Sequence, residues 1–99
     1  MARYRIDFTQ EAQSDLAYFS AYERKRIVDE VKRQLTHEPK VKTRNRKELR
    51  DSPTARWELR IGKYRAFYEV EDGTSTVVVG AVGFKVHNVL YIRGEEVKL

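Results

Sequence analysis

Cysteine is absent from this chain of 99 residues. Its absence excludes disulfide bonds, thiolate nucleophiles and thiolate zinc sites, and it is typical of proteins in a reducing compartment. Long hydrophobic runs are missing too, because the longest, VVVGAVGF at residues 77–84, is far shorter than the roughly 20 residues that cross a bilayer. The N-terminal stretch MARYRIDF has no apolar core of signal-peptide length. We therefore expect a cytoplasmic protein without a membrane partner.

The residue types needed for several common chemistries are also scarce. The two histidines, His37 and His87, are far apart in the sequence, and no carboxylates have the spacing of metal ligands. Gly80 and Gly83 lie inside an apolar stretch that predicts a strand, so they indicate close packing or a bend and not a phosphate-binding loop. We therefore predict that the protein uses neither a metal nor a cofactor.

Positive charge is what the sequence has in excess, and it is concentrated in one segment. Residues 39–50, PKVKTRNRKELR, hold six cations against the single acid Glu48, which accounts for the whole net charge of +5. Such a segment predicts a polyanion partner, because phosphates that bind to it release counterions. A solvated loop that keeps the protein soluble explains the same composition about equally well. The cations expected to bind RNA phosphates are Lys40, Lys42, Arg44, Arg46 and Lys47.

The pattern of apolar residues predicts a single α+β domain over residues 1–99. A half-buried strand is expected at residues 3–8, followed by two helices that Thr9 and Ser20 cap, the latter in a capping box with Glu23. Strands fill the second half of the chain. The order β-α-α-β-β-β predicts two layers, an antiparallel sheet with a helical hairpin on one face.

Residues 56–70, RWELRIGKYRAFYEV, predict two strands joined by a type II′ turn at Gly62-Lys63. In that register Arg60 lies directly across from Arg65, although like charges in this position are destabilising. Alternation places both arginines and Phe67 on the face away from the core, which we expect to be exposed. Arginine beside an exposed aromatic residue favours phosphate binding and base stacking, so we predict an RNA-binding surface here.

The remaining polar residues suit one reaction that needs no metal. Cleavage of RNA by its own 2′-hydroxyl requires a proton acceptor, a cation at the phosphate and a donor for the 5′-oxygen. Arginine, lysine, histidine and tyrosine can fill these roles, and the candidates are Arg65, Lys85, His87 and Tyr91. The alternative interpretation is that the last three are ordinary polar and rim residues of a strand end.

Several stretches of the sequence form a recognisable set: FTQEAQSDLAYF, RIVDEVKRQLTHEP, RNRKELR, WELRIGKYRAFYEV and VVVGAVGFKVHNVLY. Together they resemble the RelE/ParE superfamily of toxins from toxin-antitoxin pairs, over essentially the whole chain. For RelE-type members the resemblance implies an endonuclease that cuts messenger RNA in the decoding site (A site) of the 30S ribosomal subunit and that a cognate antitoxin silences. For ParE-type members it implies poisoning of DNA gyrase. We expect the RelE type, with antitoxin, ribosome and messenger RNA as partners.

The resemblance also implies roles for single residues. Arg65 stands where RelE-like nucleases hold an arginine that stabilises the transition state. Lys85 falls on the basic residue after the last core strand, with His87 at the next position of the same parity, and Tyr91 falls near the catalytic tyrosine.

The chain departs from the family pattern on the strand before the L-R step. Where the best-known nucleases have lysines, this chain has Arg56 and Glu58. We expect Arg56 and Arg60 to bind RNA. Arg65 as a structural ion-pair partner of Glu58 or Glu69 is the alternative to a catalytic Arg65. A catalytically degenerate binding module therefore stands beside the nuclease and the gyrase inhibitor as a third hypothesis.

Overall fold

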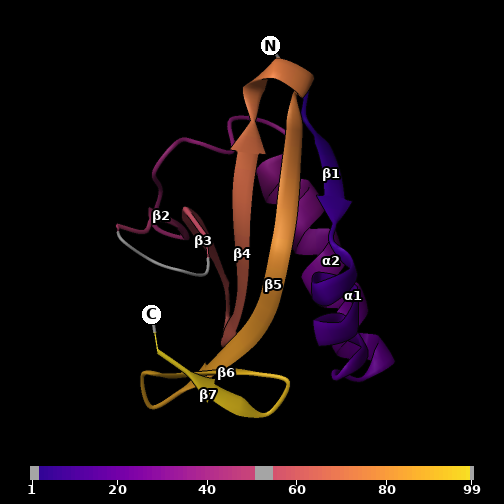
Figure 1. Ribbon diagram of the computed structural model, residues 1–99, viewed down its shortest axis with the longest axis vertical. Coiled ribbons are helices and arrows are strands. Elements are labelled where there is room, and N and C mark those ends of the chain that lie inside the picture. Colours follow the sequence, from indigo (N-terminus) through magenta and orange to yellow (C-terminus); the bar gives the residue numbers. More distant parts are fainter. Residues whose placement is uncertain (1–2, 51–54, 99) are drawn as a thin grey trace.

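The structure, a computed structural model, describes residues 3–50 and 55–98. Both helices lie on one face of a seven-stranded sheet, which confirms the predicted two-layer α+β fold (Figure 1). In chain order the elements are β1 (Arg5–Phe8), α1 (Gln10–Ala17), α2 (Ala21–Leu35), β2 (Arg46–Glu48), β3 (Trp57–Ile61), β4 (Tyr64–Glu71), β5 (Thr76–Val86), β6 (Val89–Ile92) and β7 (Glu95–Val97).

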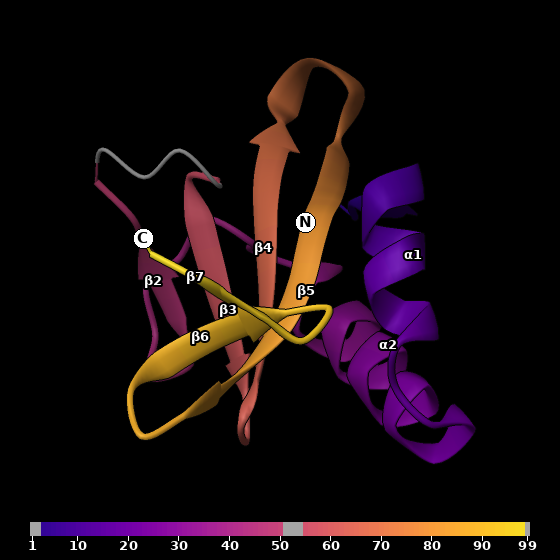
Figure 2. The same cartoon turned by 60° about the horizontal axis from the view of Figure 1, so that its bottom comes forward.

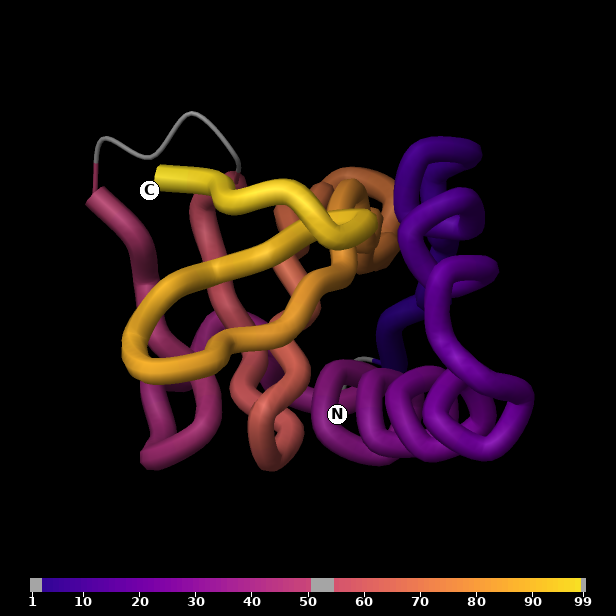
Figure 3. The backbone as a smooth tube through the Cα atoms, turned by 90° about the horizontal axis from the view of Figure 1, so that it is seen from below, coloured from indigo at the N-terminus to yellow at the C-terminus, as the bar shows by residue number. Residues whose placement is uncertain are grey.

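The helices begin where the sequence predicted. The Thr9 side chain accepts a hydrogen bond from the backbone N–H of Ala12, and Ser20 and Glu23 form the complete capping box of α2. Figure 3 shows α1 crossing α2 at a steep angle. The buried face of α2, with Ile27 fully enclosed, packs on the sheet. No helix among the described residues is long and apolar enough to cross a membrane.

Strand β5 is the centre of the sheet, and its two edges are used differently. One edge pairs with β4 along most of its length. The other edge is shared, because β1 pairs with residues 76–79 and β6 pairs with residues 84–86. The pairing of β1 with β5 is parallel, so the sheet is not antiparallel throughout as the sequence predicted. A parallel pair is possible here because both helices and three strands connect β1 to β5, whereas a tight hairpin would force them antiparallel.

The β3–β4 hairpin has the predicted register. Ile61 pairs with Tyr64, and Arg60 lies across from Arg65. Gly62 has a φ of +58° whereas Lys63 is not left-handed, the combination found in a type II′ turn.

The β6–β7 hairpin folds back over the sheet face opposite the helices. Figure 2 shows it crossing in front of β3, β4 and β5. Leu90 of this hairpin packs with Phe67 and Ala55 in a second, smaller core. Backbone approaches backbone closely here, since a Cβ atom on Gly83 would lie 2.3 Å from the Tyr91 carbonyl oxygen. The prediction that Phe67 is exposed and stacks on a base is therefore wrong, because this second core encloses its ring completely.

Candidate nucleic-acid interface

A cleft lined by three arginines lies at the turn end of the β3–β4 hairpin. We call it the arginine cleft, and its lining residues are Arg44, Asn45, Arg60, Gly62 and Arg65. Its two sides are joined by the backbone, because the Asn45 carbonyl accepts a hydrogen bond of 2.7 Å from the Arg60 N–H. Guanidinium groups that converge on one cleft form a site for a phosphate or carboxylate.

Arg65 is built into the fold as well as into the cleft. Only 9% of the residue is exposed, and its guanidinium donates hydrogen bonds of 2.8 Å to the carbonyls of Gly62 and Tyr64. Its Nε lies 3.5 Å from a carboxylate oxygen of Glu58. Burial lowers the pKa of Arg65, Glu58 raises it, and the charge of Arg60 lowers it. Glu58 therefore compensates part of the repulsion between the two arginines. The contact agrees with the alternative that Arg65 is a structural ion-pair partner of Glu58.

Glu58 is a further functional candidate, which the pattern of the sequence did not place in the site. It shares the face with Arg65, but that face is not exposed as predicted, and the Glu58 residue is 5% exposed. Its Oε1 makes no hydrogen bond within the described part of the chain. The strand register contained the signal, because Glu58 pairs with Phe67 and is therefore the diagonal neighbour of Arg65.

Arg60 and Arg44 are the arginines of the cleft that remain available to a ligand. Arg60 is exposed, and neither residue has a carboxylate partner among residues 3–50 and 55–98. Two exposed guanidinium groups are therefore available to an anion in the cleft, and the buried Arg65 is the third arginine of its lining. This arrangement binds phosphate by charge and by directed N–H donors.

The structure brings Lys85 to the same face as the arginine cleft. Gly83 pairs with Arg65, so Lys85, two residues further along β5, is the diagonal neighbour of Arg65. Its backbone N–H donates a hydrogen bond of 2.8 Å to the carbonyl of Lys63 in the hairpin turn. Arg60, Arg65 and Lys85 therefore form one cationic group around this turn.

Tyr91 and His87 do not join this group. Tyr91 pairs with Phe84 and stacks on its ring at a centroid distance of 5.4 Å. Phe84 packs on the core under the helices, so the Tyr91 ring is turned toward that core, whereas Arg65 pairs with Gly83 and shares its face. The structure therefore does not bring the Tyr91 ring together with Arg65, and its catalytic role stays a prediction. His87 is exposed at the tip of the β5–β6 turn, with a φ of +51°.

Several cations of the basic segment contact other residues at the protein surface. Lys40 lies 2.5 Å from Asp72, and the hydrogen bond with this carboxylate raises the pKa of Lys40. Lys42 lies 3.8 Å from Glu48. Arg46 donates a hydrogen bond of 2.5 Å to the Glu38 carbonyl. Of the five predicted phosphate ligands, Arg44 lines the cleft and Lys47 is exposed on β2, and neither has an acidic partner within the described residues.

Arg56 lies away from the arginine cleft. It directly precedes β3, at the end of the hairpin far from the turn, and it is exposed. Its backbone N–H donates a hydrogen bond of 3.1 Å to the Glu69 carboxylate. Arg56 and Arg60 were both predicted to bind RNA, but Arg56 lies before β3 and Arg60 lies near the turn end of that strand.

Solved structures of known proteins share this fold. The toxin-antitoxin complex RelBE2 from Mycobacterium tuberculosis matches with a TM-score of 0.72 and 29% sequence identity, covering 84% of this chain and 99% of that chain. The RelE-RelB complex from Pyrococcus horikoshii matches with a TM-score of 0.66 and 18% identity, covering 88% and 99% of the two chains. The intact RelBE complex from Escherichia coli gives a TM-score of 0.65 and 22% identity, with coverage of 85% and 99%.

The fold and these similarities define a protein of the RelE/ParE superfamily of toxins. Residues 6–84 match the family described as the ParE toxin of the type II toxin-antitoxin system parDE, and the chain belongs to this family. It is thus a toxin of a type II toxin-antitoxin system, as the resemblance in its sequence implied. No curated protein matches the chain.

Proposed function

We propose that this toxin arrests growth by cutting messenger RNA on the ribosome, in a reaction that uses the 2′-hydroxyl of the RNA and no metal. The observation that carries the proposal is the arginine cleft, in which Arg44 and Arg60 can hold a phosphate in front of Arg65. Cations fixed around a phosphate stabilise the charge that develops during its transfer. This target places the action of the toxin in the cytoplasm.

Each residue of the cleft has its own role in the proposed reaction. Arg60 and Arg44 bind the scissile phosphate, while Arg65 contributes charge from a position that Glu58 and two backbone carbonyls fix. Lys85 belongs to the predicted catalytic set and is the diagonal neighbour of Arg65 on that face. Its ammonium group acts as the proton donor. Glu58, whose Oε1 has no hydrogen-bond partner among the described residues, is the carboxylate that can accept the proton of the 2′-hydroxyl.

A cognate antitoxin is the second partner in the proposal. The similar structures from Mycobacterium tuberculosis and Escherichia coli are complexes of a toxin with its antitoxin. An acidic antitoxin segment would complement a chain of net charge +5. Its association rate should therefore fall as salt concentration rises.

Poisoning of DNA gyrase is a second candidate function, and two observations favour it. The family that matches the chain is that of ParE toxins. The structure also does not bring the Tyr91 ring together with Arg65, so the catalytic set implied by the resemblance to RelE-type nucleases is incomplete. The arginine cleft would then bind a phosphate or carboxylate of the gyrase complex.

Induced expression followed by mapping of messenger 5′ ends tests the first candidate. New 5′ ends within reading frames, which disappear in Arg60→Ala, would support the nuclease. The matched control is Arg3→Ala. Arg3 is also an exposed arginine, but it precedes β1, which pairs with the Thr76 end of β5, whereas the arginine cleft lies near the Phe84 end. Intact messenger together with broken DNA would overturn the nuclease and support the gyrase inhibitor.

A further inference from the structure

The loop that carries Arg44 into the arginine cleft is held by the side chain of a single threonine. Residues 43–46, TRNR, form a two-residue loop, because Thr43 and Arg46 exchange both backbone hydrogen bonds, at 3.1 and 3.3 Å. The Thr43 hydroxyl oxygen also accepts hydrogen bonds from the backbone N–H groups of Asn45, at 3.2 Å, and Arg46, at 3.1 Å. This side chain therefore ties the beginning of the loop to its end.

The backbone conformation of the loop explains why a side chain is needed to hold it. Two-residue loops match the twist of the strands beside them in types I′ and II′, which require a positive φ at the first central residue. Neither Arg44 nor Asn45 has a positive φ. The loop is therefore of a kind that hairpins disfavour, and the two hydrogen bonds to the Thr43 hydroxyl group offset this disadvantage.

The loop is also attached to the strand that carries Arg60. The Asn45 carbonyl accepts the 2.7 Å hydrogen bond from the Arg60 N–H. Directly after the loop, Arg46 pairs with Leu59 in the ladder between β2 and β3. The backbones of Arg44 and Arg60 are therefore held in a fixed relation to each other. An arginine loses less conformational entropy on binding a ligand when its backbone is already fixed.

We infer that Thr43 is a positioning residue for phosphate binding in the arginine cleft, because its hydroxyl group holds the loop from which Arg44 reaches the ligand. This inference rests on the proposed function, since it takes an RNA phosphate as the ligand of the cleft. Arg44 lines the cleft, whereas Thr43 is not among the lining residues. The effect of Thr43 on binding should therefore pass through Arg44.

Binding of RNA to the purified toxin tests this role without ribosomes. The probe is a fluorescent 2′-O-methyl oligouridine, which cannot be cut through its 2′-oxygen, and anisotropy at low salt gives each Kd. Thr43→Val removes the hydroxyl group and should raise Kd about fivefold, the factor that one net hydrogen bond gives. Thr43→Ser keeps the hydroxyl group and should bind like wild type. So should the matched control Thr74→Val, since Thr74 is exposed but lies in the turn after β4, far from the cleft.

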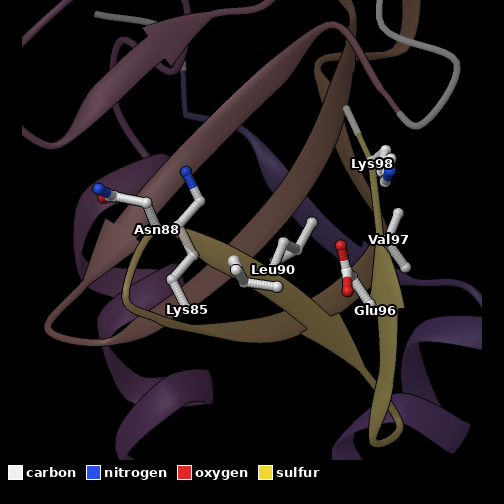
Figure 4. A pocket seen from close by; sticks show the side chains of 7 residues that line it. Lys85, Asn88, Leu90, Glu96, Val97 and Lys98 are labelled. Carbon is white, nitrogen blue, oxygen red and sulfur yellow. The ribbon is translucent and has the colours of Figure 1, made fainter.

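Double variants show whether Thr43 acts through Arg44. Thr43→Val should have no further effect on Kd in a protein that already carries Arg44→Gln. In a protein that carries Lys85→Gln, it should still raise Kd about fivefold, because distant residues act independently. Lys85 suits this comparison because β3 and β4 lie between its strand and β2, which follows the loop. Figure 4 shows the Lys85 side chain beside that of Asn88, in a separate pocket.

Equal affinity of Thr43→Val and wild type would overturn the inference. So would weak binding by Thr43→Ser, an equal effect of Thr43→Val with and without Arg44, or no measurable binding by wild type. The proposed function is tested separately, since messenger 5′ ends that depend on Arg60 would support the nuclease even without coupling between Thr43 and Arg44. Coupling together with intact messenger would support the positioning role, and the nuclease proposal alone would fail.

Discussion

The buried carboxylate of Asp15 accepts a hydrogen bond of 3.0 Å from the backbone N–H of Val82. Val82 lies on β5 between the segments that pair with β1 and with β6, so no strand is available to accept this bond. The Asp15 side chain on α1 instead accepts the hydrogen bond that a neighbouring strand would accept. Its other carboxylate oxygen lies 3.0 Å from the Nε of Arg93 in the β6–β7 turn. One side chain thus joins helix, central strand and C-terminal hairpin.

Asp15→Ala should destabilise the protein by about 1–3 kcal/mol, because it leaves the buried N–H of Val82 without an acceptor. Asp15→Asn should cost clearly less, since its amide oxygen can still accept that bond. Urea unfolding near neutral pH measures both. Equal stability of the two variants would show that the hydrogen bond contributes nothing.

The free energy of unfolding should depend on pH through both Asp15 and Glu30, and the two carboxyl groups should change it in opposite directions. Burial raises the pKa of Asp15, so protonation of this carboxyl group favours the folded state. The free energy of unfolding of wild type should therefore rise relative to that of Asp15→Asn as pH falls from about 7 to about 3. The hydrogen bond from Arg33 lowers the pKa of Glu30 to about 2, so its stabilisation is present above the ordinary carboxyl range and lost as pH falls toward that value.

Urea unfolding of wild type, Asp15→Asn and Glu30→Gln across this pH range measures both effects. Wild type should lose its advantage over Glu30→Gln as pH falls, while its difference from Asp15→Asn moves the other way. Differences that are independent of pH for both variants would contradict the assigned directions.

Gly83→Ala should destabilise the protein by about 1–3 kcal/mol, because the new methyl group would meet the Tyr91 carbonyl at 2.3 Å. The matched control is Gly80→Ala on the same strand, where a Cβ meets nothing within 4 Å. That change should be neutral or slightly stabilising, because alanine reduces the entropy of the unfolded chain. Thermal unfolding of the two variants decides the matter, and similar melting temperatures would contradict the close approach.

Arg65→Ala should destabilise the protein by about 3 kcal/mol, because it leaves the Glu58 carboxylate buried without its partner. Adding Glu58→Gln should recover part of this stability. Arg60→Ala should leave stability unchanged, since Arg60 is exposed, but should weaken nucleic-acid binding. Denaturant unfolding of the single and double variants measures the coupling, and an Arg65→Ala protein as stable as Arg60→Ala would refute a structural role for the pair.

The basic segment should divide into two functional halves. Replacing Arg44 and Lys47 by glutamine should weaken binding to single-stranded RNA and lower the slope of log K against log salt by about 1 for each phosphate that the variant no longer neutralises. Replacing Lys40 and Lys42 should affect this slope less, because Asp72 and Glu48 already compensate their charges. Titrations at several salt concentrations test this, and equal slopes for the two double variants would contradict it.

The sequence alone predicted the local structure of this protein well. The Thr9 cap, the Ser20 capping box and the Gly62-Lys63 turn involve residues close together in the chain, and all three are present. The opposition of Arg60 and Arg65 follows from that turn, because a two-residue loop fixes the register of the strands it joins. The resemblance of its motifs also identified the toxin superfamily, which the family match confirms.

Only the tertiary structure decided which sheet face is covered and which side chains meet. Alternation along one strand tells which residues share a face, but it does not tell what packs on that face. The β6–β7 hairpin lies over the sheet beside Gly83 and buries Phe67. Arg65 was expected to be an exposed cation, but in the structure it forms an ion pair with Glu58. These contacts join residues distant in sequence, and the hydrophobic burial and charge pairing that stabilise them exist only after the chain has folded.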